Sequence, residues 1–315
     1  MPSAGEQLLP PSCRALEPWS RFFSGLIERG GPNESEYLAF TGWLDTLADG
    51  LRTGLISALD AQILLFQGGR ATSSTLTLQG FARVKPHGYP GDYELIDRIY
   101  QVWNSPDPAL RNWDRYFNAQ GAARSLRGCK AYFIRWLGEA EARLPRKFSK
   151  LNLLHLGGGP GREILEYFDG APESRVACFY TDPDPHAVSY AARVCAPLFS
   201  RVTFRISNPL AFEPEFAPHL IWAGGLFDYL DDRNIVSTLR RLWRLLPSGG
   251  ELAASNFAPT NPTRSYMELN GWVINHRDAG HLKSLARQAG VAESGIKIGE
   301  VEDGFILVLH LSRAA

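Results

Sequence analysis

The feature that most constrains the fold is a run of glycines directly after an apolar segment, Leu151–Leu156. Gly157, Gly158, Gly159 and Gly161 follow it. Glycine has no Cβ, so the backbone can turn tightly there and another group can lie against its peptide units. The pattern predicts a β-strand that turns through a ligand-binding loop into a helix, whose first amide groups face the ligand.

Short apolar segments alternate with helical segments after this loop. The expected parallel strands are Leu151–Leu156, Val176–Thr181, Val202–Ile206, Leu220–Ala223 and Glu251–Ser255. Such alternation predicts a parallel sheet with helices on both faces. The last two apolar segments are joined by Glu302 and Asp303 alone, which predicts an antiparallel hairpin over 295–311. The expected fold class is therefore α/β, a Rossmann-like sheet of five parallel strands plus an antiparallel C-terminal hairpin.

The first part of the chain has a different pattern. Apolar residues recur at helical spacing over 19–27, 38–51 and 122–144. Lys85–Tyr93 contains two prolines and two glycines, which predicts a loop between helices. The sequence thus predicts an N-terminal helical cap, residues 1–147, followed by the Rossmann-like domain, residues 148–315.

The glycine spacing distinguishes two classes of nucleotide ligand. Gly157, Gly159 and Gly161 form GxGxG, whereas the dinucleotide pattern GxGxxG would require glycine at Arg162. Asp182 ends the second expected strand, 23 residues after Gly159, where a carboxylate can accept hydrogen bonds from both ribose hydroxyls. S-adenosylmethionine (SAM) carries a ribose but no pyrophosphate, so these features predict a SAM site.

Further residues would complete this site. Asn208 follows the third strand, where it either bonds to the adenine edge or closes a simple Asn-Pro turn. Ala223 and the glycines after it are small enough for the methionine part of SAM to pass. Its carboxylate needs a cation, for which Arg127 is the first candidate and Arg162 the second. Arg127 is equally well explained as a surface charge. Asp184 is the alternative ribose ligand, or else the cap of the next helix.

Charge and composition exclude several partner classes. Lys+Arg and Asp+Glu number 33 each, so no net field attracts nucleic acid or anionic lipid. The sequence shows no signal-peptide pattern and no apolar run long enough to span a bilayer. The four cysteines form no metal-ligand pattern and are expected to be free thiols. We therefore expect a cytoplasmic protein that binds a small molecule and no metal; the oligomeric state is open.

Residues 148–315 resemble the class I SAM-dependent methyltransferase superfamily. Arg83–Tyr100 and Asn261–Trp272 resemble segments of bacterial 3-hydroxypalmitate methyl ester biosynthesis proteins. The combination of a helical cap with this domain is similar to azetidine-2-carboxylate synthases. The resemblance implies an enzyme of bacterial small-molecule biosynthesis, or secondary metabolism. It would cyclise SAM to azetidine-2-carboxylate and release methylthioadenosine, or methylate a small-molecule hydroxyl or carboxylate, such as that of a 3-hydroxy fatty acid.

The residues themselves only partly separate these reactions. Tyr93, Tyr89 and Phe133 are the candidate catalytic aromatics, because an aromatic face attracts a sulfonium as it attracts an ammonium. The α-amine of SAM has an ordinary pKa of about 7.7–8.0, so cyclisation requires no strong base. We find no histidine positioned as a base after the fourth strand, and we interpret His155 as a core residue. A third interpretation is a SAM-sensing or scaffold protein without turnover.

Overall fold

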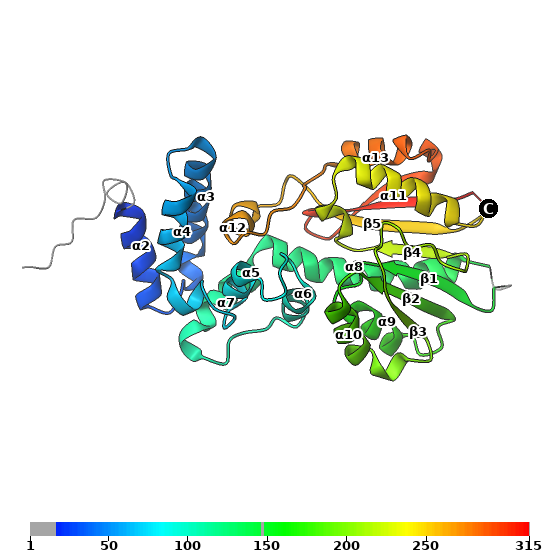
Figure 1. The fold of residues 1–315 in the computed structure, drawn as a ribbon, viewed down its shortest axis with the longest axis horizontal. Helices are drawn as coiled ribbons and strands as arrows, with labels where there is room; N and C mark the ends of the chain where they lie inside the picture. The colour runs from blue at the N-terminus through cyan, green and yellow to red at the C-terminus, as the bar shows by residue number, and fades with distance from the viewer. Residues whose placement is uncertain (1–16, 146–147, 315) are drawn as a thin grey trace, which may run out of the picture. The chain divides into compact units, whose positions relative to one another are not determined.

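A computed structural model describes residues 17–145 and 148–314 (Figure 1). They form two compact units. The helical unit contains the described residues up to Gly91, together with Val102–Gln120 and Thr263–Val273. The sheet unit contains Asp92–Gln101, Gly121–Pro262 and the described residues from Ile274 onward. Two segments that precede residue 147 thus belong to the sheet unit, and the division into a cap and a SAM-binding domain stays a prediction.

The helical unit is built around aromatic side chains. Its helices are α2 (Glu17–Glu28), α3 (Tyr37–Thr53), α4 (Ala58–Phe66), α5 (Leu78–Val84), α7 (Arg111–Ala119) and α12 (Arg264–Leu269), with the short 3-10 turns η1 (Glu34–Glu36), η2 (Gly69–Ala71) and η3 (Pro108–Leu110). Phe40 is buried between α3 and α7, with its ring centroid 4.7 Å from that of Tyr116. Such ring contacts bury large apolar areas and fix how the helices pack.

The sheet unit contains seven strands in the order β3-β2-β1-β4-β5-β7-β6. They are β1 (Leu151–Leu156), β2 (Val176–Asp182), β3 (Val202–Ile206), β4 (Leu220–Ala223), β5 (Glu251–Phe257), β6 (Ile296–Glu300) and β7 (Ile306–Ser312). The first five run parallel, while β7 is antiparallel to β5 and to β6. The predicted fold class is confirmed, a Rossmann-like methyltransferase sheet with an antiparallel C-terminal hairpin.

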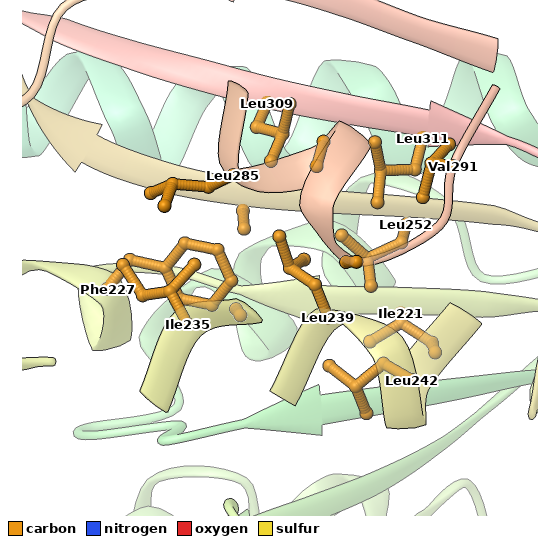
Figure 2. Packing of buried hydrophobic residues seen from close by; sticks show 14 of the residues in the cluster. Ile221, Phe227, Ile235, Leu239, Leu242, Leu252, Leu285, Val291, Leu309 and Leu311 are labelled. Atoms are coloured by element: carbon orange, nitrogen blue, oxygen red, sulfur yellow. The ribbon is translucent and has the colours of Figure 1, made fainter. Parts of the chain in front are cut away.

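Helices cover both faces of this sheet (Figure 1). The helices of this unit are α6 (Tyr93–Tyr100), α8 (Gly121–Arg143), α9 (Arg162–Gly170), α10 (Pro185–Val194), α11 (Asp232–Leu245) and α13 (Ala279–Gln288), with the short turns η4 (Ala196–Leu198), η5 (Leu226–Tyr229) and η6 (Glu293–Gly295). Leu154 on β1 and its partner Ile221 on β4 pack in the core formed with α11 and α13 (Figure 2). The next pair, His155 and Trp222, contacts α8 on the other face.

Both faces of the central strands are therefore buried, as in other parallel sheets. This burial leaves the strand ends as the part of the sheet that can meet a ligand. In open α/β sheets, ligands bind outside the carboxyl ends of the strands, where loops leave toward opposite faces. The glycine loop after β1 lies at this edge.

Candidate functional site

The glycine loop owes its shape to backbone conformations that other residues rarely adopt. Gly157, Gly159 and Gly161 have positive φ angles of 61°, 52° and 70°. A Cβ on Gly158 would lie 2.0 Å from Cε2 of Tyr180, so the loop rests directly on that ring. At Gly159 a Cβ would meet no atom of the described residues within 4 Å. The loop is therefore tightly supported from below and open at Gly159, as a ligand cradle requires.

We expect Gly158→Ala to destabilise the sheet unit, because the new methyl group would overlap the ring of Tyr180. Overpacking of this kind typically costs about 1–3 kcal/mol in the free energy of unfolding. Gly170→Ala is the matched control, since a Cβ there meets no described atom within 4 Å. Denaturant titration measures both variants. Equal stability of Gly158→Ala and wild type would show that the loop does not rest on Tyr180.

Asp182 ends β2 directly beside this loop. Its side chain accepts hydrogen bonds from the amides of Gly159 (3.1 Å) and Asp184 (3.0 Å). The residue is 7% exposed, and this burial raises the pKa of its carboxyl above the ordinary value, although the two amides oppose the shift. A carboxylate has about four acceptor positions, so two remain for ribose hydroxyls. Asp184 itself caps α10 by accepting from the amide of His186 at 2.8 Å.

The structure places the other expected nucleoside residues as follows. Asn208 is exposed, and its side-chain oxygen accepts from the amide of Leu210 at 2.9 Å, which closes the Asn-Pro turn. Its contact with adenine stays a prediction. Ala223 is fully buried at the end of β4. After it, the chain turns at Gly225, which has a φ of 71° and donates to the hydroxyl of Ser255 at 2.8 Å.

The two candidate arginines differ in their partners. Arg162, at the start of α9, forms a two-pronged ion pair with Asp97 on α6, with Nη2 2.9 Å from the carboxylate. This pairing occupies the guanidinium edge that a methionine carboxylate would need. Arg127 on α8 is half-buried, and burial lowers the pKa of its guanidinium. The structure thus weakens the case for Arg162, and the role of Arg127 stays a prediction.

The candidate aromatics fall in three different places. Tyr93 begins α6, is 7% exposed and lies with its ring centroid 5.1 Å from that of Tyr190 on α10. Burial, followed by the charge of Asp184, raises the pKa of its hydroxyl, so the ring lies near the start of α10. Phe133 is fully buried under the sheet, between His155 and Trp222. Tyr89 belongs to the helical unit, and its role stays a prediction.

A buried polar pair lies below the glycine loop and was not foreseen. His155 Nε2 is 3.2 Å from Oε1 of Glu163, the second residue of α9, with side chains 1% and 8% exposed. The geometry is not that of a hydrogen bond, and Nδ1 of His155 has no partner among the described residues. His155 is thus a core residue, as expected. Its ring nitrogens make no hydrogen bond to the backbone of the described residues, and the ring instead packs against the carboxylate of Glu163.

Asp228 is the second unforeseen group, on η5 just after β4. It is 4% exposed, and its Oδ1 accepts from the amide of Phe257 at 2.8 Å. Within the described residues, its carboxylate accepts no other hydrogen bond and has no ion-pair partner. Burial raises the pKa of Asp228 to about 7, although the Phe257 amide and the charge of Arg277 both act to lower it. The carboxyl therefore changes its charge near neutral pH.

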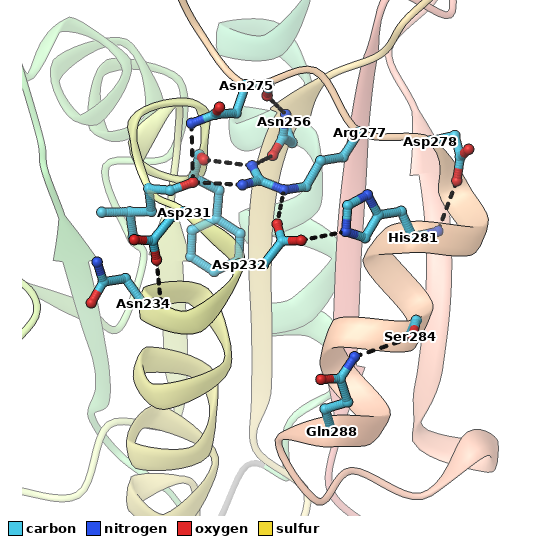
Figure 3. Close-up of polar contacts among 12 residues, drawn as sticks. Asp231, Asp232, Asn234, Asn256, Asn275, Arg277, Asp278, His281, Ser284 and Gln288 are labelled. Carbon is cyan, nitrogen blue, oxygen red and sulfur yellow. Dashed lines mark hydrogen bonds and ion pairs between the residues drawn. The ribbon is translucent and has the colours of Figure 1, made fainter.

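Arg277, whose charge acts on Asp228, donates its hydrogen bonds to other groups (Figure 3). Its Nε donates to Asp232 at 2.8 Å, and Nη1 donates to Asn256 Oδ1 at 2.9 Å and to the carbonyl of Phe227 at 3.0 Å. Nη2 donates to the carbonyl of Leu230. Arg277 thus ties η5 to β5 and α11 without binding the Asp228 carboxylate directly.

We expect the stability of the wild type to fall between about pH 4 and pH 7 because of Asp228. In the unfolded chain the carboxyl releases its proton near its ordinary pKa of 3.8, whereas in the folded chain it holds the proton until about pH 7. An acid whose pKa is raised on folding stabilises the protein below its unfolded pKa and loses that contribution as pH rises, by about 1.4 kcal/mol per unit. Asp228→Asn should therefore gain stability relative to wild type as pH rises through this window. Thermal unfolding of both proteins at pH 5 and 7 measures it, and a constant difference would contradict the assignment.

No protein-family model matches the chain. Trans-aconitate 2-methyltransferase of Methylobacterium radiotolerans is 33% identical over 115 residues, which are 36% of this chain and 41% of that protein. The match thus spans less than half of this relative.

Among solved structures, a protein of Bordetella parapertussis described as a possible exported protein aligns with 99% of this chain and 100% of its own, at 17% identity and a TM-score of 0.59. The N-methyltransferase NodS of Bradyrhizobium japonicum, in complex with S-adenosylhomocysteine, aligns with 71% of this chain and 98% of its own, at 14% identity and a TM-score of 0.44. That similarity is too low to carry an inference. The fold is a Rossmann-like, mostly parallel seven-stranded sheet with antiparallel C-terminal strands, like that of Rossmann-like methyltransferases. The curated relative that matches over part of its length is named as a methyltransferase.

Two general features of the described residues bear on the ligand class. They contain no group of three or more His, Cys, Asp or Glu side chains that could hold a metal ion. Among them, no helix is both long enough and apolar enough to cross a membrane.

Three of the four cysteines lie within the described residues. Cys129, Cys178 and Cys195 are buried free thiols, and burial raises the pKa of Cys129 to about 12. Cys13 lies outside the described residues.

Proposed function

We propose that the sheet unit binds SAM at the carboxyl edge of β1, β2 and β4. The observation that carries this proposal is the direct link between the two nucleoside elements, the hydrogen bond from the Gly159 amide to the Asp182 carboxylate. It joins the open position of the glycine loop to the carboxylate that ends β2. A ligand with a ribose would meet both at once. The fit extends to Tyr93, whose ring lies beside α10 at the same edge.

We further propose that the bound SAM is cyclised to azetidine-2-carboxylate with release of methylthioadenosine. The proposal rests on the combination of a helical cap with a Rossmann-like domain, which is similar to azetidine-2-carboxylate synthases. Two segments, Arg83–Tyr100 and Asn261–Trp272, resemble 3-hydroxypalmitate methyl ester biosynthesis proteins of the same architecture. Parts of both segments meet in the helical unit, where Arg83 Nη1 donates to the carbonyl of Leu269 at 3.1 Å. The two bonded residues are 186 positions apart, so the two segments pack together in the fold and are not independent linkers.

Cyclisation depends mainly on positioning. The α-amine must approach Cγ of its own chain along the line opposite to sulfur, and a near-attack geometry can supply several kcal/mol of the barrier. Side chains that hold the methionine part in a folded conformation would therefore matter more than any strong base. Excluding water is the second requirement, because water competes with the amine for the activated carbon.

Methyl transfer to a small-molecule carboxylate or hydroxyl is the second candidate. It is favoured by the partial match to a relative named for methylating trans-aconitate, a carboxylic acid. A carboxylate acceptor is already a nucleophile at neutral pH, so this reaction too would need positioning more than base catalysis.

The nucleoside product distinguishes the two candidates. Purified protein is incubated with SAM and no acceptor, and the products are separated by liquid chromatography and identified by mass spectrometry. Cyclisation predicts methylthioadenosine and azetidine-2-carboxylate in equal amounts, above the spontaneous breakdown of SAM. Methyl transfer predicts S-adenosylhomocysteine, formed only after an acceptor such as a tricarboxylate or 3-hydroxy fatty acid is added. A protein that binds SAM but yields neither product would be a sensor or scaffold.

A further inference from the structure

Asp228 lies beside the glycine loop. β1 and β4 are neighbouring parallel strands, so the loops that follow them leave the same edge of the sheet. Leu226 begins η5, and a Cβ on Gly157 would lie 3.6 Å from its Cδ1, which is van der Waals contact. Asp228 is two residues further along the same short turn. The carboxyl is thus placed past β4, on the side of the glycine loop opposite to Asp182 on β2.

The surroundings of Asp228 leave its carboxylate incompletely satisfied. A buried carboxylate is normally paired with a cation or with several hydrogen-bond donors, because its desolvation is costly. Asp228 has one donor, the amide of Phe257, within the described part of the chain. The hydrogen bonds of Arg277 go to Asp232, Asn256 and backbone carbonyls. A cationic ligand group would supply the partner that the protein does not.

We propose that Asp228 binds the α-ammonium group of the adenosyl amino acid and accepts its proton before ring closure. This inference rests on the proposed function, because it requires SAM at the edge described above. The ribose and the amino acid are at different ends of SAM. The proposed ribose ligand, Asp182, is on β2, and the turn that carries Asp228 follows β4, on the other side of β1. The α-ammonium is the cationic group of the amino-acid end, and the turn after β4 is where that end would lie.

The step balances as a proton transfer followed by a displacement. One N–H bond of the α-ammonium breaks, and the proton passes to the free oxygen of the Asp228 carboxylate. The nitrogen lone pair then forms a bond to Cγ while the Cγ–S bond breaks, and its electron pair stays on sulfur. The products are methylthioadenosine and the protonated ring amine. Before they meet, the two groups have similar acidities, since the pKa of Asp228 in the ligand-free protein is about 7 and that of a free α-ammonium is about 7.7–8.0.

A purely structural role for Asp228 is the competing explanation, because Oδ1 holds the amide of Phe257. Asp228→Asn separates the two, since the amide oxygen of asparagine can accept the same hydrogen bond but cannot ionise. Asp231→Asn is the matched control. Asp231 is an exposed carboxylate three residues away that caps α11 by accepting from the amide of Asn234, and asparagine caps a helix equally well.

Proton release on ligand binding tests the proposal without turnover. S-adenosylhomocysteine carries the α-ammonium but cannot react, whereas methylthioadenosine lacks it. Calorimetry at pH 7 in buffers of different ionisation enthalpy counts the protons. A cation beside a half-protonated Asp228 lowers its pKa, so the wild type should release about half a proton with S-adenosylhomocysteine and none with methylthioadenosine. Asp228→Asn should abolish this release, and Asp231→Asn should keep it.

Affinity and turnover should change in parallel. Asp228→Asn should weaken S-adenosylhomocysteine about tenfold or more and leave methylthioadenosine unchanged. Its turnover of SAM should fall at least about a hundredfold, with loss of the rise in rate near pH 7. Equal proton release in Asp228→Asn and wild type would overturn the inference while the proposed function stands. If the wild type binds neither SAM nor S-adenosylhomocysteine, the proposed function itself fails.

Discussion

Asp182→Ala is expected to weaken SAM binding by two to four orders of magnitude. In the proposed site, the variant would lose two charge-assisted hydrogen bonds to the ribose, each contributing about 1.5–3 kcal/mol. It also releases the amides of Gly159 and Asp184, which the carboxylate now orders. One carboxylate would therefore be lost both from the glycine loop, which it orders, and from the ligand, which it would bind. Calorimetric titration with S-adenosylhomocysteine measures the change.

Asp184→Asn serves as the comparison for Asp182→Ala. Asparagine can still accept from the His186 amide, so the start of α10 should remain intact. We expect its affinity for S-adenosylhomocysteine to stay within a few-fold of wild type. Unchanged affinity in Asp182→Ala together with a large loss in Asp184→Asn would assign the ribose to Asp184 instead.

Asp97→Ala is expected to destabilise the sheet unit by about 3–5 kcal/mol. Asp97 is 1% exposed and joins three helices, because its carboxylate accepts from Arg162 on α9, from Tyr190 on α10 (2.7 Å) and from Gln101 at the end of α6 (2.7 Å). Removing one partner of a buried ion pair leaves the other charge without compensation, which is the origin of the large cost.

Chemical denaturation measures the effect of Asp97→Ala. Asp169→Ala, at an exposed position near the end of α9, should change stability by no more than about 0.5 kcal/mol. A loss below 1 kcal/mol in Asp97→Ala would mean that α6 is not held to the sheet unit by this network. Because Tyr93 begins α6, such a result would also remove the support for placing its ring near the ribose.

The sequence predicted the parts of the fold that depend on local pattern. The bounds of β1, β3 and β4 agree with the expected segments, because each is a short apolar run bounded by turn residues. The cap of α10 by Asp184 follows from local chemistry in the same way. The hairpin at the C-terminus was predicted from the two residues between its strands, although both strands begin one or two residues later than expected.

The unforeseen residues depend on contacts between distant segments. Asp97 meets Arg162 across 65 residues and Tyr190 across 93, and no local pattern specifies such a pairing. Tyr180 supports the glycine loop only because β2 lies beside β1. For Asp228 the sequence offered one weak indication of a functional role, namely an acidic residue three positions after the glycine pair that follows β4. Its burial, and hence its chemistry, became apparent only once η5 was packed against β5.

The reaction is harder to predict than the cofactor for the same physical reason. In the proposed site, the glycine loop and Asp182 would recognise a nucleoside through backbone shape and one carboxylate, and both features can be read from the sequence. The choice between attack on the methyl carbon and attack on Cγ depends on the conformation of the bound methionine chain. Side chains from several segments would set that conformation together.

The most direct test of the central claim follows the S-methyl group itself. SAM labelled with ¹³C at this methyl is incubated with the purified protein and a mixture of small carboxylic and hydroxy acids, and every product is analysed by mass spectrometry. Our account predicts that the label stays in methylthioadenosine and that azetidine-2-carboxylate forms without label. Appearance of the label on an added acid, with S-adenosylhomocysteine as the nucleoside product, would contradict cyclisation and establish methyl transfer.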